Sequence, residues 1–295
     1  MSLESLNKRI KSTADLRDIV STMKLLSSVS IGPYEKALSS LKKYGKTLES
    51  AFLGLILNEK DITPPSLPKD KSFKTIAILI GTDNGLVGKF NRDVINYANS
   101  YFKTHGYEQD GLIYLCIGKR INGLMSAHKN LIAASYPISN SLKEIASIAS
   151  EILKKTDEII QKQKVKQVLI FYNHRESGQP QKTDKRQLIP LPKNTFMSLK
   201  QKRWEGKNFP LVTADKDALF SALSHEFLTV TLTGALTASL AAEHYARMMN
   251  MQQAEKNIDE SLETMNLEYQ QARQTAITDE LIDIVSGAES MRKKK

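Results

Sequence analysis

The segment of this sequence that most resembles a ligand-binding loop is residues 81–88 (Gly-Thr-Asp-Asn-Gly-Leu-Val-Gly). It follows an apolar run and precedes a predicted helix, where loops that bind dinucleotides and phosphates occur. Its spacing does not fit Gly-x-Gly-x-x-Gly. A P-loop also fails, because Asp83 replaces the first glycine and Phe90 replaces the magnesium-binding hydroxyl. The alternatives are a small-molecule site and a tight structural turn, and the mismatches favour the turn.

The other reactive side chains form no recognisable catalytic or metal site. Asp83 has no nucleophile near it in a known motif, so we expect it to cap the turn or a helix. The single cysteine, Cys116, lies in the apolar run 112–117, which predicts a buried thiol without a disulfide. No pair of histidines has metal-ligand spacing among His105, His128, His174, His225 and His244. No cofactor, metal or catalytic residue is therefore predicted.

The net charge of +10 is unevenly distributed along the chain. Residues 182–207 carry eight basic side chains and two acidic ones, whereas residues 243–289 carry ten acidic and three basic ones. An acidic segment is poorly suited to following a phosphate backbone, which argues against nucleic-acid binding. We find neither a signal peptide nor an apolar run of the ~20 residues that span a bilayer, so we expect the protein to stay in the cytoplasm.

The C-terminal segment predicts a very long helix, because residues 235–286 contain neither glycine nor proline. Apolar residues recur there at spacings of four and three, as in a coiled coil, and the rhythm resumes one position later near the end. The first series is Ile258, Leu262, Met265, Tyr269, Ala272 and Ala276, and the second is Ile277, Leu281, Ile284 and Ala288.

Residues 1–58 predict a second long helix, which is the natural partner of the first. Over residues 1–50 it carries nine basic and five acidic side chains, the opposite bias to the C-terminal helix. Gly32-Pro33 predicts a kink. The apolar stripe expected to face the partner consists of Leu16, Ile19, Val20, Met23, Leu26, Tyr34, Ala37, Leu41, Tyr44, Leu48, Phe52 and Leu55.

Strand and helix patterns alternate between the two long helices, which predicts an inserted, Rossmann-like α/β domain with a largely parallel sheet. The predicted strands are 75–80, 112–117, 131–138 and 165–172, with helices at 91–103 and 141–161 and an edge strand at 187–191. We expect a helix at 1–58, a proline-rich linker at 59–72, the α/β domain at 73–212 and a helix at 213–295. The two helices should form an antiparallel coiled coil, because both leave the same compact domain.

Several segments together resemble the gamma subunit of rotary F-type ATP synthases. The most specific are residues 247–251 (Arg-Met-Met-Asn-Met) and 269–288, which contain Arg273, Thr278, Glu280, Asp283 and Gly287. Further matches occur, in the expected order, at residues 9–12, 23–24, 81–91 and 187–192. The resemblance thus spans the whole chain.

The resemblance implies a central shaft without catalytic activity and without a bound cofactor. Its coiled coil would enter a ring of three alpha and three beta subunits, with the catalytic sites on beta. Its α/β domain would rest, with the epsilon subunit, on a membrane ring of c subunits, at the cytoplasmic face of a bacterial plasma membrane. The alternatives are a standalone coiled-coil scaffold and an α/β enzyme that binds a small molecule at residues 81–88.

The same resemblance implies two sets of contact residues. Contacts with the alpha/beta ring would involve Met23, Lys24, Arg247, Gln274, Thr278, Glu280 and Asp283. Contacts at the foot, near the c-ring, would involve Lys200, Lys202, Arg203, Trp204 and Glu205.

The sequence also departs from the family pattern in two places. Asn84, Val87 and Lys89 replace Arg, Cys and Gly at the first turn, and residues 27–34 replace a basic segment after Met23-Lys24. These departures resemble the divergent bacterial branch called N-type or alternate F-ATPases, and they bear on the contacts of the first helix rather than on the fold.

Overall fold

The computed structural model describes the two long helices and most of the α/β region. The described residues are 2–58, 73–126, 131–139, 141–176, 179, 181–192, 204, 208 and 210–292, with only the backbone for 287–292. The expected linker at 59–72 lies outside them. Contacts divide the chain into two units, residues 1–28 with 247–295, and residues 29–246. The sequence predicted other boundaries, at residues 58, 72 and 212, and that division stays a prediction.

Both long helices are present. Helix α1 spans Leu3–Asn58 and is assigned helical throughout, with Pro33 inside it. Helix α6 spans Lys216–Arg292, a length of 77 residues. The kink expected at Gly32-Pro33 stays a prediction.

Residues 29–246 contain a five-stranded sheet in the order β3-β2-β1-β4-β5. The strands are β1 (Lys74–Ile80), β2 (Leu112–Ile117), β3 (Ile132–Tyr136), β4 (Val165–His174) and β5 (Lys182–Ile189). The first four pair in parallel and β5 is antiparallel to β4, which confirms a largely parallel sheet. The connecting elements are α2 (Phe90–Thr104), η1 (Gln109–Gly111), α3 (Lys119–Leu124) and α4 (Leu142–Lys162).

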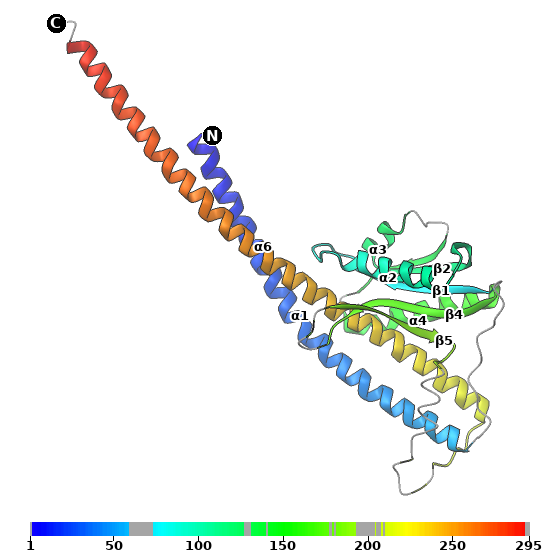
Figure 1. The fold of residues 1–295 in the computed structure, drawn as a ribbon. Helices are drawn as coiled ribbons and strands as arrows, with labels where there is room; N and C mark the ends of the chain where they lie inside the picture. The colour runs from blue at the N-terminus through cyan, green and yellow to red at the C-terminus, as the bar shows by residue number, and fades with distance from the viewer. Residues whose placement is uncertain are drawn as a thin grey trace. The chain divides into compact units, whose positions relative to one another are not determined.

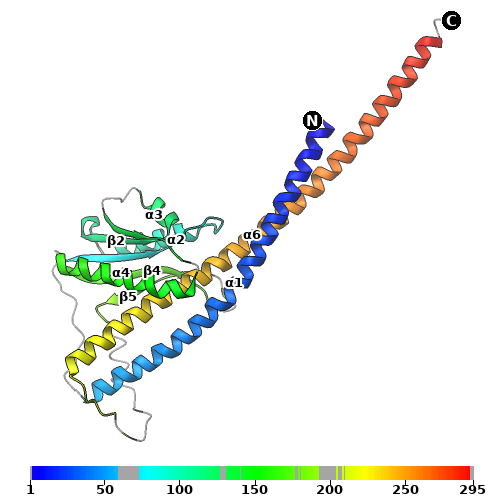
Figure 2. The same cartoon turned by 180° about the vertical axis from the view of Figure 1, so that it is seen from behind.

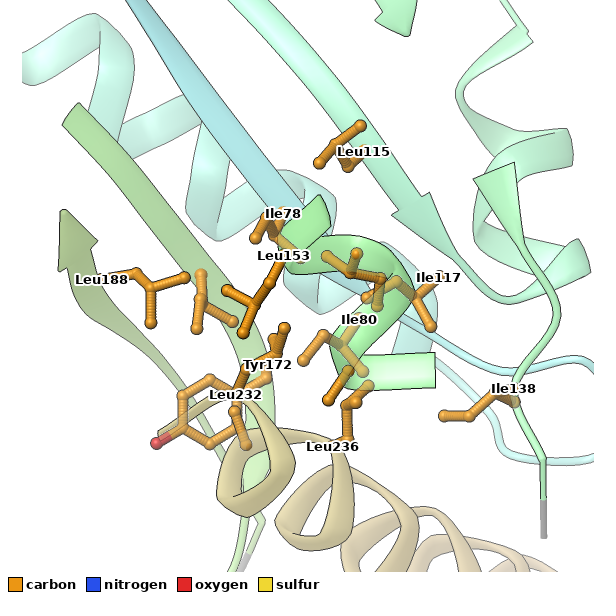
Figure 3. Packing of buried hydrophobic residues seen from close by; sticks show 14 of the residues in the cluster. Ile78, Ile80, Leu115, Ile117, Ile138, Leu153, Tyr172, Leu188, Leu232 and Leu236 are labelled. Carbon is orange, nitrogen blue, oxygen red and sulfur yellow. The ribbon is translucent and has the colours of Figure 1, made fainter. Parts of the chain in front are cut away.

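The sheet is covered by helices on both faces, as a parallel sheet requires (Figures 1 and 2). Alternate residues of β1 point to opposite sides. Ile76, Ile78 and Ile80 pack with α4, α6 and Tyr34 of α1, whereas Ala77 and Leu79 pack with α2 and α3. Figure 3 shows Leu232 and Leu236 of α6 directed toward the side chains on the first face, including Ile80 and Tyr172.

The two long helices are antiparallel within this unit. Tyr34 stacks on His244, the Tyr44 hydroxyl donates a hydrogen bond to Glu226, and Phe52 contacts Phe220 and Phe227 edge to face. Residue numbers therefore fall along α6 as they rise along α1. The predicted antiparallel pairing is confirmed here.

Two elements differ from the sequence expectation. The edge strand predicted at 187–191 is β5, which begins at Lys182 and ends at Ile189. Its charged residues hide the apolar pattern by which a strand is recognised in a sequence. Charged side chains on an edge strand also prevent the sheet from pairing with other chains. Helix α3 was not predicted, because a helix of six residues is too short to show a recognisable apolar repeat.

An 18-residue window within α6 reaches a mean hydropathy of 1.2, enough by length and composition to cross a membrane, although no such run was expected from the sequence. Only 22% of that window is buried. Length and composition are weak evidence for a membrane span, and α6 packs Leu232, Leu236 and Leu240 against the sheet. In this region α6 therefore contributes one side, with these three leucines, to the core of the α/β unit.

Replacing Leu236 by alanine should lower the free energy of unfolding by about 2–5 kcal/mol, because the side chain is fully enclosed and its loss leaves a cavity. Urea unfolding followed by circular dichroism would measure the change. Leu267→Ala on the exposed side of the same helix is the matched control and should change stability by less than about 0.5 kcal/mol. Equal effects of the two substitutions would contradict the packing described.

Candidate functional site

The paired helix ends, residues 3–28 and 247–286, form the first candidate site. On α6 the less exposed residues repeat every seven positions, as the sequence predicted. One series is Met251, Ile258, Met265 and Ala272, and the second is Glu255, Leu262, Tyr269 and Ala276. Such a seven-residue repeat is the signature of a coiled-coil seam.

Helix α1 presents a different face to this seam from the one predicted. Its buried or half-buried positions also repeat every seven residues, at Leu6, Thr13, Val20 and Ser27. Of the predicted stripe here, only Val20 and the half-buried Met23 lie in the seam. Leu16, Ile19 and Leu26 were assigned to it wrongly, since they are 50%, 57% and 62% exposed. The error arose because the stripe was traced through the most apolar residues, while the true seam includes a threonine and a serine.

Two ion pairs tie the helices together and confirm their antiparallel course in this unit. Arg17 Nε lies 2.6 Å from Asp259 Oδ1, and Lys24 Nζ donates to Glu255 Oε2. From the first pair to the second, the residue number rises on α1 and falls on α6, as antiparallel helices require. The hydrogen bond from Lys24, followed by one from Ser21, lowers the pKa of Glu255 below its ordinary value.

The tip of α6 carries apolar side chains that no described part of this chain covers. Ile277, Leu281 and Ile284 were expected to continue the seam, which is wrong, because they are 48%, 58% and 68% exposed. Figure 1 shows the reason: α6 continues beyond the N-terminal end of α1. Ile282 and Val285 are also exposed, so apolar surface surrounds the tip. The Ala288 side chain lies outside the described residues.

The residues predicted to contact the ring fall into two groups. Gln274, Thr278, Glu280 and Asp283 are exposed near the tip of α6, and the Thr278 hydroxyl donates a hydrogen bond to the Gln274 carbonyl. Lys24 and Arg247 are held within the chain, Lys24 by Glu255 and Arg247 by burial to 8% exposure. Met23 is half-buried beside them.

Of the residues predicted at the foot, only Trp204 is described. Its indole Nε1 donates a hydrogen bond to the Asn208 carbonyl at 2.8 Å, and its ring lies near Gly54 of α1. Lys200, Lys202, Arg203 and Glu205 lie outside the described residues.

The second candidate, residues 81–88, forms a tightly fixed turn. The Asn91 amide accepts a hydrogen bond from Thr82 N and donates one to the Thr82 hydroxyl. A Cβ at Gly81 would lie 2.3 Å from that amide oxygen, which explains the glycine. Asp83 Oδ1 accepts from the backbone N–H groups of Lys119 and Ile138, so it caps α3 rather than the helix that follows the turn.

Two further expectations about reactive side chains can be assessed. Cys116 is fully buried in β2, and burial raises the pKa of its thiol to about 12, so the predicted unreactive thiol is confirmed. Among the described residues no group of three or more His, Cys, Asp or Glu side chains could hold a metal ion. His128 lies outside the described residues.

Comparison with known proteins decides the family. A family model described as ATP synthase matches residues 2–291. Relatives named ATP synthase gamma chain include those of Geobacter metallireducens, 28% identical over 99% of both chains, and Pelagibacter ubique, 27% identical over 98% of this chain and 99% of that one. The chain belongs to the ATP synthase gamma-chain family. The resemblance inferred from the sequence is thereby confirmed, and a gamma chain is a non-catalytic stalk subunit of a membrane-associated complex.

Solved structures share the fold at low sequence identity. One is a chain in the Euglena gracilis mitochondrial ATP synthase, in an OSCP/F1/c-ring structure, with a TM-score of 0.66 at 14% identity, covering 98% of this chain and 94% of that chain. Another comes from the central stalk/c-ring structure of Tetrahymena thermophila, with a TM-score of 0.57 at 17% identity, covering 80% and 99%. The fold is therefore shared with chains of solved ATP synthase structures at 14% and 17% identity.

The ion pair between Lys24 and Glu255 predicts a pH-dependent stability. Because the folded pKa of Glu255 is lowered, its stabilisation is present above the ordinary glutamate pKa of about 4.3 and is lost as the pH falls through the lowered value. Lys24→Met should therefore destabilise the helix pair at neutral pH, and this penalty should shrink on acidification. Urea unfolding between about pH 7 and pH 3 would measure it.

Lys11→Met is the control for that experiment, since Lys11 is exposed on the same helix. If the loss of unfolding free energy caused by Lys24→Met did not depend on pH, the ion pair between Lys24 and Glu255 would not be what stabilises the two helices at this position.

Proposed function

We propose that this chain is the rotating central shaft of a bacterial F-type ATP synthase or ATPase. The paired helix ends enter a ring of three alpha and three beta subunits, and the α/β domain rests with the epsilon subunit on the membrane c-ring. The family match over residues 2–291 supports this role. The structural observation that carries it is the exposure of apolar side chains on α1 and around the tip of α6, because exposed apolar surface marks a site of interaction with other proteins.

The mechanical role follows from asymmetry. A single shaft inside a ring of three equivalent catalytic subunits contacts each of them differently, and so favours a different conformation at each site. Rotation exchanges these contacts, which couples ion flow through the c-ring to ATP synthesis, or ATP hydrolysis to ion pumping. The catalytic residues belong to beta, so this chain needs none of its own. We propose that the complex lies at the cytoplasmic face of the bacterial plasma membrane.

We assign the contacts with the ring to two places. The side chains of Gln274, Thr278, Glu280 and Asp283 are exposed, and they can form hydrogen bonds with loops of the ring that later release them. Met23, Lys24 and Arg247 form the second place. Lys24 would exchange Glu255 for a carboxylate of the ring, so that a contact within the shaft competes with a contact outside it.

The foot is assigned from the sequence. Residues 182–207 are strongly basic and include Lys200, Lys202 and Arg203, with Trp204 and Glu205 beside them. Basic side chains suit the polar loops of a c-ring and the anionic lipid headgroups around it.

Reversing the charge of Lys200, Lys202 and Arg203 together should weaken attachment of the α/β domain to the c-ring, because attraction becomes repulsion. Co-purification of the c-ring with the assembled complex, at low and high salt, would measure it. Reversal of Lys36, Lys42 and Lys43, which are exposed on α1 outside the paired helix ends, provides a charge-matched control. Unchanged attachment after reversal at the foot would remove this assignment.

Truncation of the tip tests the shaft itself. This chain would be co-expressed with alpha and beta from the same source, beside a variant lacking residues from Thr278 onward, and ATP turnover of the purified complexes compared. We expect one copy per alpha/beta hexamer and a clear fall in turnover for the truncated shaft, since the exposed apolar tip is lost. A variant lacking only residues from Gly287 onward is the control and should retain more activity.

Ile284→Asp provides a sharper version of the same test. The side chain is 68% exposed, so the isolated chain should keep its helical content, while a charge inside an apolar sleeve should weaken assembly or slow turnover by about tenfold or more. The exposed Asn266→Asp is the control. If no complex forms with the unaltered chain, or if turnover ignores it, the standalone scaffold becomes the better explanation.

A further inference from the structure

A cavity of about 770 Å³ lies between the turn after β1 and helix α3. Four basic side chains line it. Lys89 immediately precedes α2 and Arg92 lies in its first turn, while Lys119 and Arg120 begin α3. No acidic residue is among those that line it. The cavity thus gathers four positive charges at the carboxyl ends of two adjacent parallel strands, β1 and β2.

These cations have no carboxylate partner at ion-pair distance among the residues that the structure describes. In the described part of the protein none of the four side chains forms an ion pair, and all four are exposed. The nearby Asp83 accepts two backbone hydrogen bonds at its Oδ1, and its single negative charge offsets only part of the four positive charges. Like charges gathered at one place repel one another, and a bound anion would relieve that repulsion.

The backbone that carries the four side chains is fixed in place. The Thr82 and Asn91 hydrogen bonds hold the turn to the start of α2, and Arg120 N donates to the Thr82 carbonyl at 2.9 Å. A Cβ at Gly118 would lie 2.7 Å from Thr82 N, so β2 approaches the turn as closely as glycine allows. A preorganised backbone lowers the cost of binding, since little has to be ordered on association.

The geometry points to a multiply charged phosphate anion of the di- or triphosphate class as the ligand of this cavity. Its volume lies within the roughly 300–1,000 Å³ of small-molecule pockets. Two guanidinium groups supply the planar, two-pronged donors that phosphate oxygens match, and the two lysines add point charges. The carboxyl ends of parallel strands are also where α/β sheets bind ligands. This site differs from a P-loop, whose pattern residues 81–90 do not have, because side chains rather than a glycine-rich loop supply the charge.

The anion has two sources with the same chemistry, an inorganic polyphosphate or the phosphates of a nucleotide. Leu86 and Leu124 also line the cavity and are 57% and 48% exposed, which offers apolar contact to a nucleoside. The inference does not depend on the shaft role, and it concerns the α/β unit alone.

Isothermal titration calorimetry of the full-length chain tests the site, with sodium tripolyphosphate and ATP as separate probes and without added magnesium. We expect saturable binding that the double variant Arg92→Gln/Arg120→Gln weakens by about tenfold or more, since both guanidinium groups and their charge-assisted hydrogen bonds to the phosphate chain are lost. Lys103→Gln/Lys143→Gln, at exposed positions outside the cavity lining, is the charge-matched control and should bind as the unaltered chain does.

The relative affinities for ATP and tripolyphosphate distinguish the two sources of the anion. Tighter binding of ATP than of tripolyphosphate identifies a nucleotide site, and equal binding identifies a site for the phosphate chain alone. No binding, or binding that the cavity variant and the control weaken equally, would overturn the proposal. So would a heptaglutamate peptide that binds as tightly as tripolyphosphate, because the cavity would then be a docking surface for an acidic protein segment. Circular dichroism of both variants checks that they remain folded.

Discussion

The α/β unit depends on the burial of one side of α6 against its sheet. A mainly parallel sheet exposes two apolar faces, and α2 and α3 cover only one of them. The other is closed by α4 together with α6, through Leu232, Leu236 and Leu240, each almost wholly buried. The long C-terminal helix is therefore part of the core in this region. Its position relative to the sheet is set by the same packing that makes the sheet stable.

Beyond residue 246, the buried positions of α6 follow a seven-residue repeat. The paired helix ends there have several apolar residues outside their seam. The α1 side of the seam includes Thr13 and Ser27, while Leu16, Ile19 and Leu26 point outward. A pair selected only for its own stability would place its leucines in the seam. The outward leucines instead offer their hydrophobic surface to a partner outside the chain. The ion pairs to Asp259 and Glu255 help to hold the register of the two helices.

The sequence alone predicted the long helices, the strand order of appearance and the heptad rhythm of α6, because each depends on a period sustained over many residues. It failed where a period was short or polar residues stood in apolar positions. Helix α3 is too short to show a period, β5 is disguised by Lys182, Lys185 and Arg186, and the α1 seam is disguised by Thr13 and Ser27. The cation-lined cavity was not foreseen either, because Lys89 and Arg120 are brought together by the parallel register of β1 and β2 rather than by proximity in sequence.

The turn at residues 81–88 shows why a motif and a site are different things. Its spacing does not fit a phosphate loop, and the structure explains two of its residues locally. The Asn91 amide leaves no room for a side chain at Gly81, and Asp83 caps α3. Those same constraints bring the start of α2 beside the start of α3. Four cations are then close enough to act together, although no short segment contains them all. A binding site can in this way result from the rigidity of a structural turn, and its chemistry must be sought in the side chains that the turn positions.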